Sequence, residues 1–265
     1  MHKHQPDADT MTRVLDLDAA VTGGYLDTAT DIIASLIPAP ATLVDLGSGT
    51  GTGSIALARR FPRARVIALD NSTELLARVA DNAAAAGVGA RIETREADLT
   101  AALPDDLTDI DVAWASSTLH HFADADALLR STCASLRPDG LLVAIEIDGA
   151  PTFLPDDAPE HLLERRLQAA MTANGWNAHP DWGPAITAAG FDLTETRVIN
   201  ADPTVGDDVL AEYAIAWYTH LRSGLSHALS ADERTALDAL LTSLPHRRDL
   251  TVTARRIAWI ARRPS

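Results

Sequence analysis

The stretch Leu43-Val44-Asp45-Leu46-Gly47-Ser48-Gly49-Thr50-Gly51-Thr52-Gly53 decides how the rest of the chain is interpreted. It begins with an apolar run interrupted only by Asp45, which is typical of a parallel strand buried on both faces. Glycines then alternate with other residues, and a helical pattern follows. Because glycine has no Cβ, it lets backbone N–H groups approach a ligand closely, and the start of a helix favours an acceptor or an anion. We therefore expect a nucleotide-like cofactor at this turn.

Apolar runs and helical patterns alternate on the C-terminal side of this stretch. Strands are expected at residues 42–46, 65–69, 90–94, 110–115, 141–147, 191–199 and 250–261, and helices at about 52–60, 73–86, 122–136, 160–173, 181–189, 205–222 and 231–243. On the N-terminal side, residues 11–37 carry a broken helical pattern and residues 1–10 are expected to be disordered. This order predicts an α/β fold: a doubly wound, Rossmann-like sheet of seven mostly parallel strands with helices on both faces.

The helical patterns also divide the chain into regions. Residues 1–40 are interpreted as an N-terminal helical lid segment, and residues 41–150 as the cofactor-binding core. Residues 151–265 complete the sheet and carry helical cap insertions at about 151–180 and 205–245. Prolines at positions 151, 155 and 159 mark the change of character after the core.

Composition excludes several classes of function. Acidic residues outnumber basic ones by 37 to 22, which disfavours nucleic-acid and membrane partners. The pairs Arg255-Arg256 and Arg262-Arg263 are interpreted as solvated side chains. Lys3 is the only lysine, so neither a Walker-type phosphate loop nor a lysine Schiff base is available. The polar N-terminus, the lack of a run of about 18 apolar residues and the single cysteine favour a cytoplasmic protein.

Acidic residues follow the second and third predicted strands. Asp70 lies 23 residues after Gly47, close to the interval at which a carboxylate meets a ribose diol in nucleotide-binding sheets. The alternative is that Asp70 caps the helix that follows. After the third strand, Asp98 is placed to accept from an adenine amino group while Leu99 packs beside the ring.

The glycine spacing discriminates between cofactors. A dinucleotide fingerprint requires a third glycine where Thr52 stands. Together, the glycine stretch, Asp70, Asp98-Leu99 and the run Leu136-Arg137-Pro138-Asp139-Gly140-Leu141-Leu142 resemble the class I S-adenosylmethionine-dependent methyltransferases of small-molecule type. The resemblance covers about residues 40–148. It implies S-adenosyl-L-methionine as the cofactor and an antiparallel last strand next to the fifth.

The resemblance also implies individual cofactor contacts. Asp70 would hold the ribose hydroxyls, Asp98 the adenine amino group, and Ser116 would line the path to the methyl group. Tyr25 and Arg13 are candidates for the cofactor's carboxylate. The full implied set lies at the strand ends and in the N-terminal segment: Tyr25, Gly47, Ser48, Gly49, Gly51, Asp70, Asn71, Asp98, Leu99 and Ser116.

The substrate side is expected after the fourth strand, where His120 and His121 follow Ser116. Histidine titrates near neutral pH, so His120 is the first candidate for a general base and His121 the second; both are also candidates for substrate contact. The alternative is that one of them packs or caps the next helix and neither transfers a proton. Adjacent histidines are poorly spaced to share an ion, even with Glu146 or Asp148, and no metal is expected.

Trp176 is a further candidate for substrate contact, because Asn174-Gly175 places it on a turn. The alternative is that it belongs to the core of the cap.

These observations predict methyl transfer to a small molecule by a bacterial enzyme that is a monomer or homodimer. Oxygen is favoured as the methylated atom, because a histidine base suits a hydroxyl group. Two alternatives stay open: an NAD-dependent oxidoreductase, and a non-catalytic cofactor-binding protein of the same fold.

Overall fold

The computed structural model describes residues 8–100, 102–122, 124–176, 181–200 and 205–265. They form two compact units, which we describe separately. The sheet unit consists of the described parts of Tyr25–Ile147, His179–Ile199 and Arg256–Ser265. The helical unit consists of the described parts of Met1–Gly24, Asp148–Ala178 and Asn200–Arg255.

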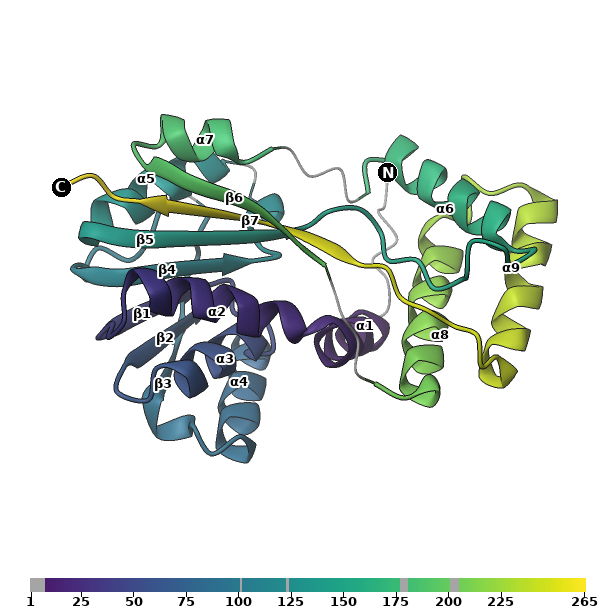
Figure 1. The fold of residues 1–265 in the computed structure, drawn as a ribbon, viewed down its shortest axis with the longest axis horizontal. Coiled ribbons are helices and arrows are strands. Elements are labelled where there is room, and N and C mark those ends of the chain that lie inside the picture. Colours follow the sequence, from purple (N-terminus) through teal and green to yellow (C-terminus); the bar gives the residue numbers. More distant parts are fainter. Residues whose placement is uncertain (1–7, 101, 123, 177–180, 201–204) are drawn as a thin grey trace. The chain divides into compact units, whose positions relative to one another are not determined.

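The alternating pattern folds into one sheet of seven strands, which confirms the predicted fold class (Figure 1). The strands are β1 (Thr42–Leu46), β2 (Arg65–Asp70), β3 (Ile92–Glu96), β4 (Ile110–Ser116), β5 (Leu136–Ile147), β6 (Asp192–Asn200) and β7 (Arg255–Arg262). Their order across the sheet is β3-β2-β1-β4-β5-β7-β6. The pairings from β3 through β5 are parallel, and β7 is antiparallel to β5, as the resemblance implied.

Helices of the sheet unit cover both faces of the sheet. They are α2 (Gly24–Leu36), α3 (Thr52–Arg60), α4 (Thr73–Ala85), α5 (Ala125–Ser135) and α7 (Gly183–Ala188). Successive strand residues point to opposite faces. Leu43 therefore packs in one core with Ile33 of α2, whereas Val44 packs in the other core with Leu129 of α5. This two-sided burial explains why β1 has so continuous an apolar run.

The direction of the strand order reverses at the centre of the sheet. The chain moves outward from β1 through β2 to β3, and then returns to place β4 on the other side of β1. Ligands of open α/β sheets bind at such a reversal, beyond the carboxyl ends of the strands. Here those ends are Leu46 of β1 and Ser116 of β4.

The helical unit has a hydrophobic core of its own. Its helices are α1 (Ala8–Thr22), α6 (His161–Ala173), α8 (Asp207–Gly224) and α9 (Ala231–Ser243). Helix α9 begins with a capping box in which Ser230 accepts from the Glu233 backbone and the Glu233 side chain accepts from the Ser230 backbone. Among the described residues, no helix is long and apolar enough to cross a membrane.

Three predicted boundaries are wrong. The last strand begins at Arg255 rather than at residue 250, because Thr253, just before it, forms an isolated bridge with Thr152 of the helical unit. The fifth strand begins earlier than predicted, at Leu136, with an irregular register opposite β4. Helix α1 begins at Ala8, so residues 8–10 are helical; residues 1–7 lie outside the described part of the chain.

Candidate active site

The turn after β1 requires glycine. Gly47 has φ 68° and Gly49 has φ 54°, both in the left-handed region that favours glycine. A Cβ added to Gly47 would lie 2.0 Å from Thr118 Oγ1, so the turn and the segment after β4 approach closely. At Gly49, by contrast, a Cβ would meet no described atom within 4 Å. The Ser48 N–H donates to Leu69 O at 2.8 Å and ties the turn to β2.

Asp70 lies at the end of β2 and holds the glycine turn. Its Oδ2 accepts from Gly49 N at 3.0 Å, and its Oδ1 accepts from Ser72 N at 3.0 Å. The helix-cap alternative is wrong, because the N-cap of α4 is Ser72, whose Oγ accepts from Leu75 N. A carboxylate oxygen has a second lone pair, so Asp70 retains acceptor capacity for a ligand. Its contact with a ribose stays a prediction.

The end of β3 carries one exposed and one buried candidate. Asp98 is exposed and its Oδ1 accepts from Thr100 N at 3.0 Å, a hydrogen bond that lowers the pKa of Asp98. Leu99 is buried and belongs to the core on the α5 side of the sheet. Asn71, after β2, is exposed. The adenine contacts of these residues stay predictions.

Asp45 is a buried carboxylate that the sequence interpretation missed. It lies within β1, is 3% exposed, and its Oδ2 accepts from Ser54 Oγ at 2.6 Å. Burial raises the pKa of Asp45 to about 6, and the hydrogen bond from Ser54 offsets part of this effect. A charged residue inside an apolar strand is the signal that could have found it. Asp45 links β1 to the first turn of α3, the two elements that flank the glycine turn.

The turn fits a polar cofactor. Ser48 Oγ is buried and has no hydrogen-bond partner among the described residues. A buried hydroxyl without a partner costs free energy, which a ligand's polar atom would recover. This hydroxyl lies in the turn beside the open space at Gly49 and just before the N-terminus of α3. S-adenosylmethionine presents a carboxylate and an amino group that suit such a place.

Two predicted residues meet at the end of β4. Tyr25 of α2 and Ser116 are joined by a hydrogen bond between their hydroxyl oxygens, 2.9 Å apart. The guanidinium of Arg256 lies over the Tyr25 ring, 4.3 Å from its centroid, and donates to Ser117 Oγ at 3.1 Å. Ser117 has φ 52°, a strained conformation for a non-glycine residue that often marks a functional site.

His120 lies in a short 3-10 helix, Leu119–His121, and is paired with a buried carboxylate. Its Nδ1 is 2.7 Å from Glu146 Oε2. Glu146, near the end of β5, has a side chain that is only 1% exposed, whereas the His120 side chain is 27% exposed. The His121 ring lies beside that of His120, with centroids 4.0 Å apart. The described residues include no group of three His, Cys, Asp or Glu side chains that could hold a metal ion.

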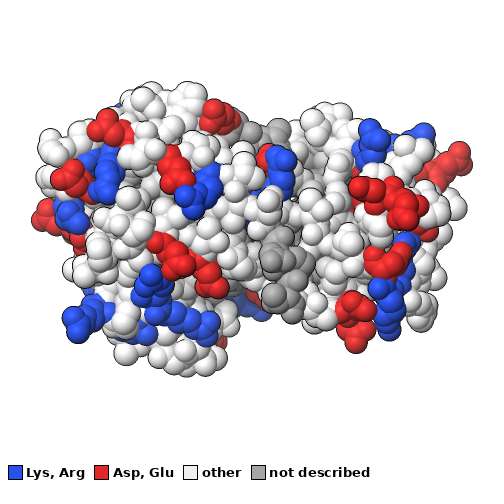
Figure 2. Space-filling view, viewed as in Figure 1, with Lys and Arg blue, Asp and Glu red and all other residues white. Residues whose placement is uncertain are grey.

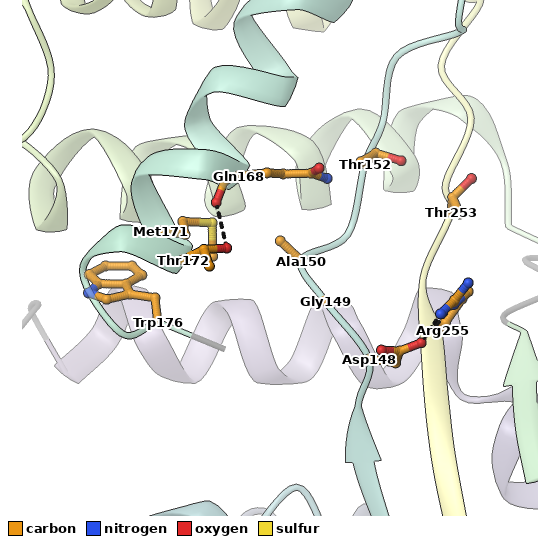
Figure 3. Close-up of a pocket in the computed structure, with 10 residues that line it drawn as sticks. All are labelled: Asp148, Gly149, Ala150, Thr152, Gln168, Met171, Thr172, Trp176, Thr253 and Arg255. Atoms are coloured by element: carbon orange, nitrogen blue, oxygen red, sulfur yellow. Dashed lines mark hydrogen bonds and ion pairs between the residues drawn. The ribbon is translucent and has the colours of Figure 1, made fainter. Parts of the chain in front are cut away.

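Trp176 belongs to the helical unit, where it packs against Gly224 and His220. There it lines a pocket of about 260 Å³ together with Met171 (Figure 3). The remaining lining residues are Asp148, Gly149, Ala150, Thr152, Gln168, Thr172, Thr253 and Arg255. Its substrate contact stays a prediction. Arg13, the second carboxylate candidate, forms an ion pair with Glu212 of the same unit.

The charged side chains correct one interpretation. Acidic and basic side chains of the described residues are interspersed on the face drawn in Figure 2. The interpretation of Arg256 as a solvated side chain is wrong, because it is 4% exposed and lies against Tyr25. Glu146 was considered only as a metal ligand. The signal that could have identified it is its place near a strand end, which Asp70 shares.

Comparisons with known proteins show which family the chain resembles. A methyltransferase domain model matches residues 43–140. The trans-aconitate 2-methyltransferase of Methylobacterium nodulans is 30% identical over 206 residues, covering 70% of this chain and 74% of that protein. The protein of the same name from Streptomyces coelicolor is 31% identical over 231 residues. That alignment covers 80% of this chain, which spans only 65% of the length of this relative.

A solved structure agrees in fold. Geranyl diphosphate methyltransferase in complex with S-adenosylmethionine superposes with a TM-score of 0.53, covering 98% of this chain and 93% of the other at 15% identity. S-adenosyl-L-methionine is the cofactor that the family uses, and the glycine turn fits it. From the matched domain, the relatives and the seven-stranded sheet with its antiparallel last strand, we conclude that the chain belongs to the class I S-adenosylmethionine-dependent methyltransferases.

Proposed function

We propose that this enzyme transfers a methyl group from S-adenosylmethionine to an oxygen atom of a small molecule. The observation that carries the proposal is the close approach of two segments, the glycine turn at Gly47 and the residues after β4, which include His120. A histidine held by the carboxylate of Glu146 thus lies beyond the strand ends where the family binds its cofactor. Family membership does not favour the oxidoreductase alternative.

The cofactor contacts form the first part of the proposal. Gly47, Ser48 and Gly49 would face its methionine part, supported by the Ser48 hydroxyl without a described partner. Asp70 would accept from the ribose hydroxyls with its remaining lone pairs. The contacts around the adenine and along the methyl path would come from Asn71, Asp98, Leu99, Ser116 and Tyr25.

The substrate contacts form the second part. The bound cofactor supplies a methyl group on a positively charged sulfur. The chain aligns the acceptor atom with that group and excludes water. An acceptor hydroxyl must also lose its proton, and His120 would take it. His121 and Trp176 remain candidates for holding the substrate.

The names of the relatives support oxygen as the acceptor atom. Trans-aconitate, which names both of the relatives described above, is a carboxylic acid whose heteroatoms are all oxygens. An ionised carboxylate needs no base, whereas a hydroxyl group does. A panel of acceptors should therefore contain both kinds, so that a requirement for His120 can be measured for each.

The test is methyl transfer from labelled S-adenosylmethionine to trans-aconitate, hydroxy acids, phenols and amines, with products identified by mass spectrometry. We expect a methyl ester or ether. Products methylated only on nitrogen would contradict the proposal, and firm binding of S-adenosylhomocysteine without any transfer would favour the non-catalytic alternative. A monomer or homodimer in the cytoplasm of a bacterium stays a prediction.

Cofactor binding has a separate test. Asp70→Ala should weaken S-adenosylhomocysteine binding at least about tenfold, or roughly 1.4 kcal/mol, measured by calorimetry. Asp81→Ala, on the exposed side of α4, is the matched control and should leave the affinity unchanged. Equal affinity of Asp70→Ala and the wild type would rule out the ribose contact.

A further inference from the structure

We propose that Glu146 is a positioning residue that sets the tautomer of His120, with the proton on Nδ1 and the lone pair on Nε2. The inference rests on the proposed function, in which His120 is the base. It adds which nitrogen of the ring accepts the proton and which residue decides this.

The contacts of Glu146 divide between its two oxygens. Oε1 accepts from the backbone N–H groups of Thr118 at 3.1 Å and Leu119 at 2.8 Å. Oε2 is left for the ring of His120, 2.7 Å from Nδ1. One oxygen thus anchors the segment after β4, and the other orients the imidazole. The two tasks belong to different atoms, so a substitution can separate them.

The chemistry of the pair fixes the tautomer. A carboxylate can only accept hydrogen bonds, so the proton in the short contact belongs to Nδ1 of His120. In a neutral imidazole the other nitrogen, Nε2, then carries the lone pair and can act as the base. The same logic of an oriented histidine operates in hydrolases, where a buried carboxylate holds the ring and stabilises its charged form.

The surroundings make the arrangement rigid. The Glu146 side chain is 1% exposed, so little water competes for its oxygens. Gly47 packs against Thr118 and adds a second contact to the segment. The backbone of Ser117 enters the segment in a strained conformation that the surrounding contacts must maintain.

The proton balance follows from this arrangement. The acceptor hydroxyl gives its proton to Nε2 of His120, which becomes an imidazolium ion facing the carboxylate of Glu146. The acceptor oxygen bonds to the methyl carbon as the carbon–sulfur bond breaks, and that electron pair stays on sulfur. For an acceptor that is already ionised, such as a carboxylate, neither residue has a proton to move.

The experiment uses Glu146→Gln in the full chain with S-adenosylhomocysteine bound. The glutamine oxygen can still accept from Thr118 and Leu119, but its amide group donates toward Nδ1 and so places the proton on Nε2. Nitrogen-15 chemical shifts of the His120 ring report the tautomer directly. Modification of Nε2 by diethyl pyrocarbonate, resolved by mass spectrometry, gives a second readout that needs no substrate.

We expect the wild-type ring to be protonated on Nδ1 and the variant ring on Nε2, with Nε2 modified at least about tenfold more slowly in the variant. For a hydroxyl acceptor found in the panel, kcat should fall at least about 100-fold in Glu146→Gln, while KM and S-adenosylhomocysteine affinity stay within about threefold. Glu74→Gln, on the exposed face of α4, is the matched control and should change none of these quantities.

Several results would overturn the inference. Protonation of the wild-type His120 ring on Nε2 would overturn it, and this measurement does not depend on whether Glu146→Gln folds. An unchanged kcat in Glu146→Gln, together with a large loss in His120→Ala, would reject the positioning role and keep His120 as the base. Full activity of His120→Ala toward hydroxyl acceptors would overturn both the inference and the base assignment, while methyl transfer to oxygen would still stand.

Discussion

Each of the two units of this protein contains a buried glutamate that anchors a neighbouring segment. In the sheet unit, Glu146 accepts from the backbone after β4. In the helical unit, Glu164 of α6 is 2% exposed and accepts from the backbone N–H of Phe153 at 2.6 Å. Each glutamate therefore supplies the hydrogen-bond acceptor that these backbone N–H groups would otherwise lack.

The two glutamates differ in the side chain that each contacts. Oε2 of Glu146 contacts His120, whose side chain is 27% exposed. Oε1 of Glu164 accepts from the hydroxyl of Tyr218, which is 1% exposed. Oε2 of Glu164 lies 3.8 Å from Nδ1 of His161, which is too far for a hydrogen bond. Burial raises the pKa of Tyr218, so the phenol stays a neutral donor. A buried carboxylate alone therefore does not indicate function; the exposure and chemistry of its last partner do.

The largest expected effect is on the free energy of unfolding and tests Glu164. Glu164→Ala leaves Phe153 N and the Tyr218 hydroxyl without their acceptor inside a core, so the free energy of unfolding should fall by roughly 3–5 kcal/mol. Urea unfolding followed by tryptophan fluorescence measures the loss. Glu164→Gln keeps an acceptor and should lose clearly less. A loss below about 1 kcal/mol in Glu164→Ala would show that Glu164 is no anchor.

A third buried carboxylate, Asp45, should make the stability of the protein depend on pH. Asp45 has one side-chain donor, Ser54, and its pKa is raised to about 6 from an ordinary value of 3.8. The folded state thus binds the proton more tightly, so stability is greatest at low pH and is lost as pH rises through the folded value. The free energy of unfolding should fall by about 3 kcal/mol between pH 3 and pH 8 because of this group.

The matched variant isolates that contribution. Asp45→Asn removes the titrating group, so its stability relative to the wild type should increase by about 3 kcal/mol over the same range. Urea unfolding at both pH values measures the difference. Parallel pH profiles for the two proteins would contradict the assignment of this pH dependence to Asp45.

A smaller effect tests how firmly the segment after β4 is held. Gly47→Ala should lower the free energy of unfolding by roughly 2–3 kcal/mol, because a left-handed alanine is strained and its Cβ meets Thr118 Oγ1. Gly49→Ala is the control: its φ is equally unfavourable, but a Cβ there meets nothing described, so about 1–2 kcal/mol is expected. Equal losses in urea unfolding would mean that the Thr118 contact is easily displaced.

The smallest expected effect tests Tyr218, whose hydroxyl donates to Glu164. Tyr218→Phe removes one donor to Glu164 and should cost about 1 kcal/mol of unfolding free energy without changing S-adenosylhomocysteine affinity. Calorimetry and urea unfolding of the same preparation measure both quantities. A loss of cofactor affinity in Tyr218→Phe would break the assignment of Glu164 and Tyr218 to stability alone.

The predictable parts of the molecule were those encoded by local patterns. The glycine turn and all seven strands follow from spacings within a few residues or from periodicity, and Asp70 follows from its place at the end of a predicted strand. Glu146 and His120 lie 26 residues apart and meet only because β4 and β5 pair in register. The burial of Arg256 likewise depends on its tertiary contact with Tyr25, which no local pattern reveals. The predicted strand start at residue 250 failed because a periodic stretch continued across the boundary between units.

The position of β7 also bears on how the protein is made. This strand is the last in sequence, yet it lies between β5 and β6, and Thr194 of β6 donates to Ile260 O of β7 at 2.8 Å. During synthesis, one edge of β5 therefore stays unpaired until β7, Arg255–Arg262, has left the ribosome. An open strand edge of this kind can pair with another chain. Nascent chains that stall before β7 should consequently be the aggregation-prone species and the ones that chaperones bind.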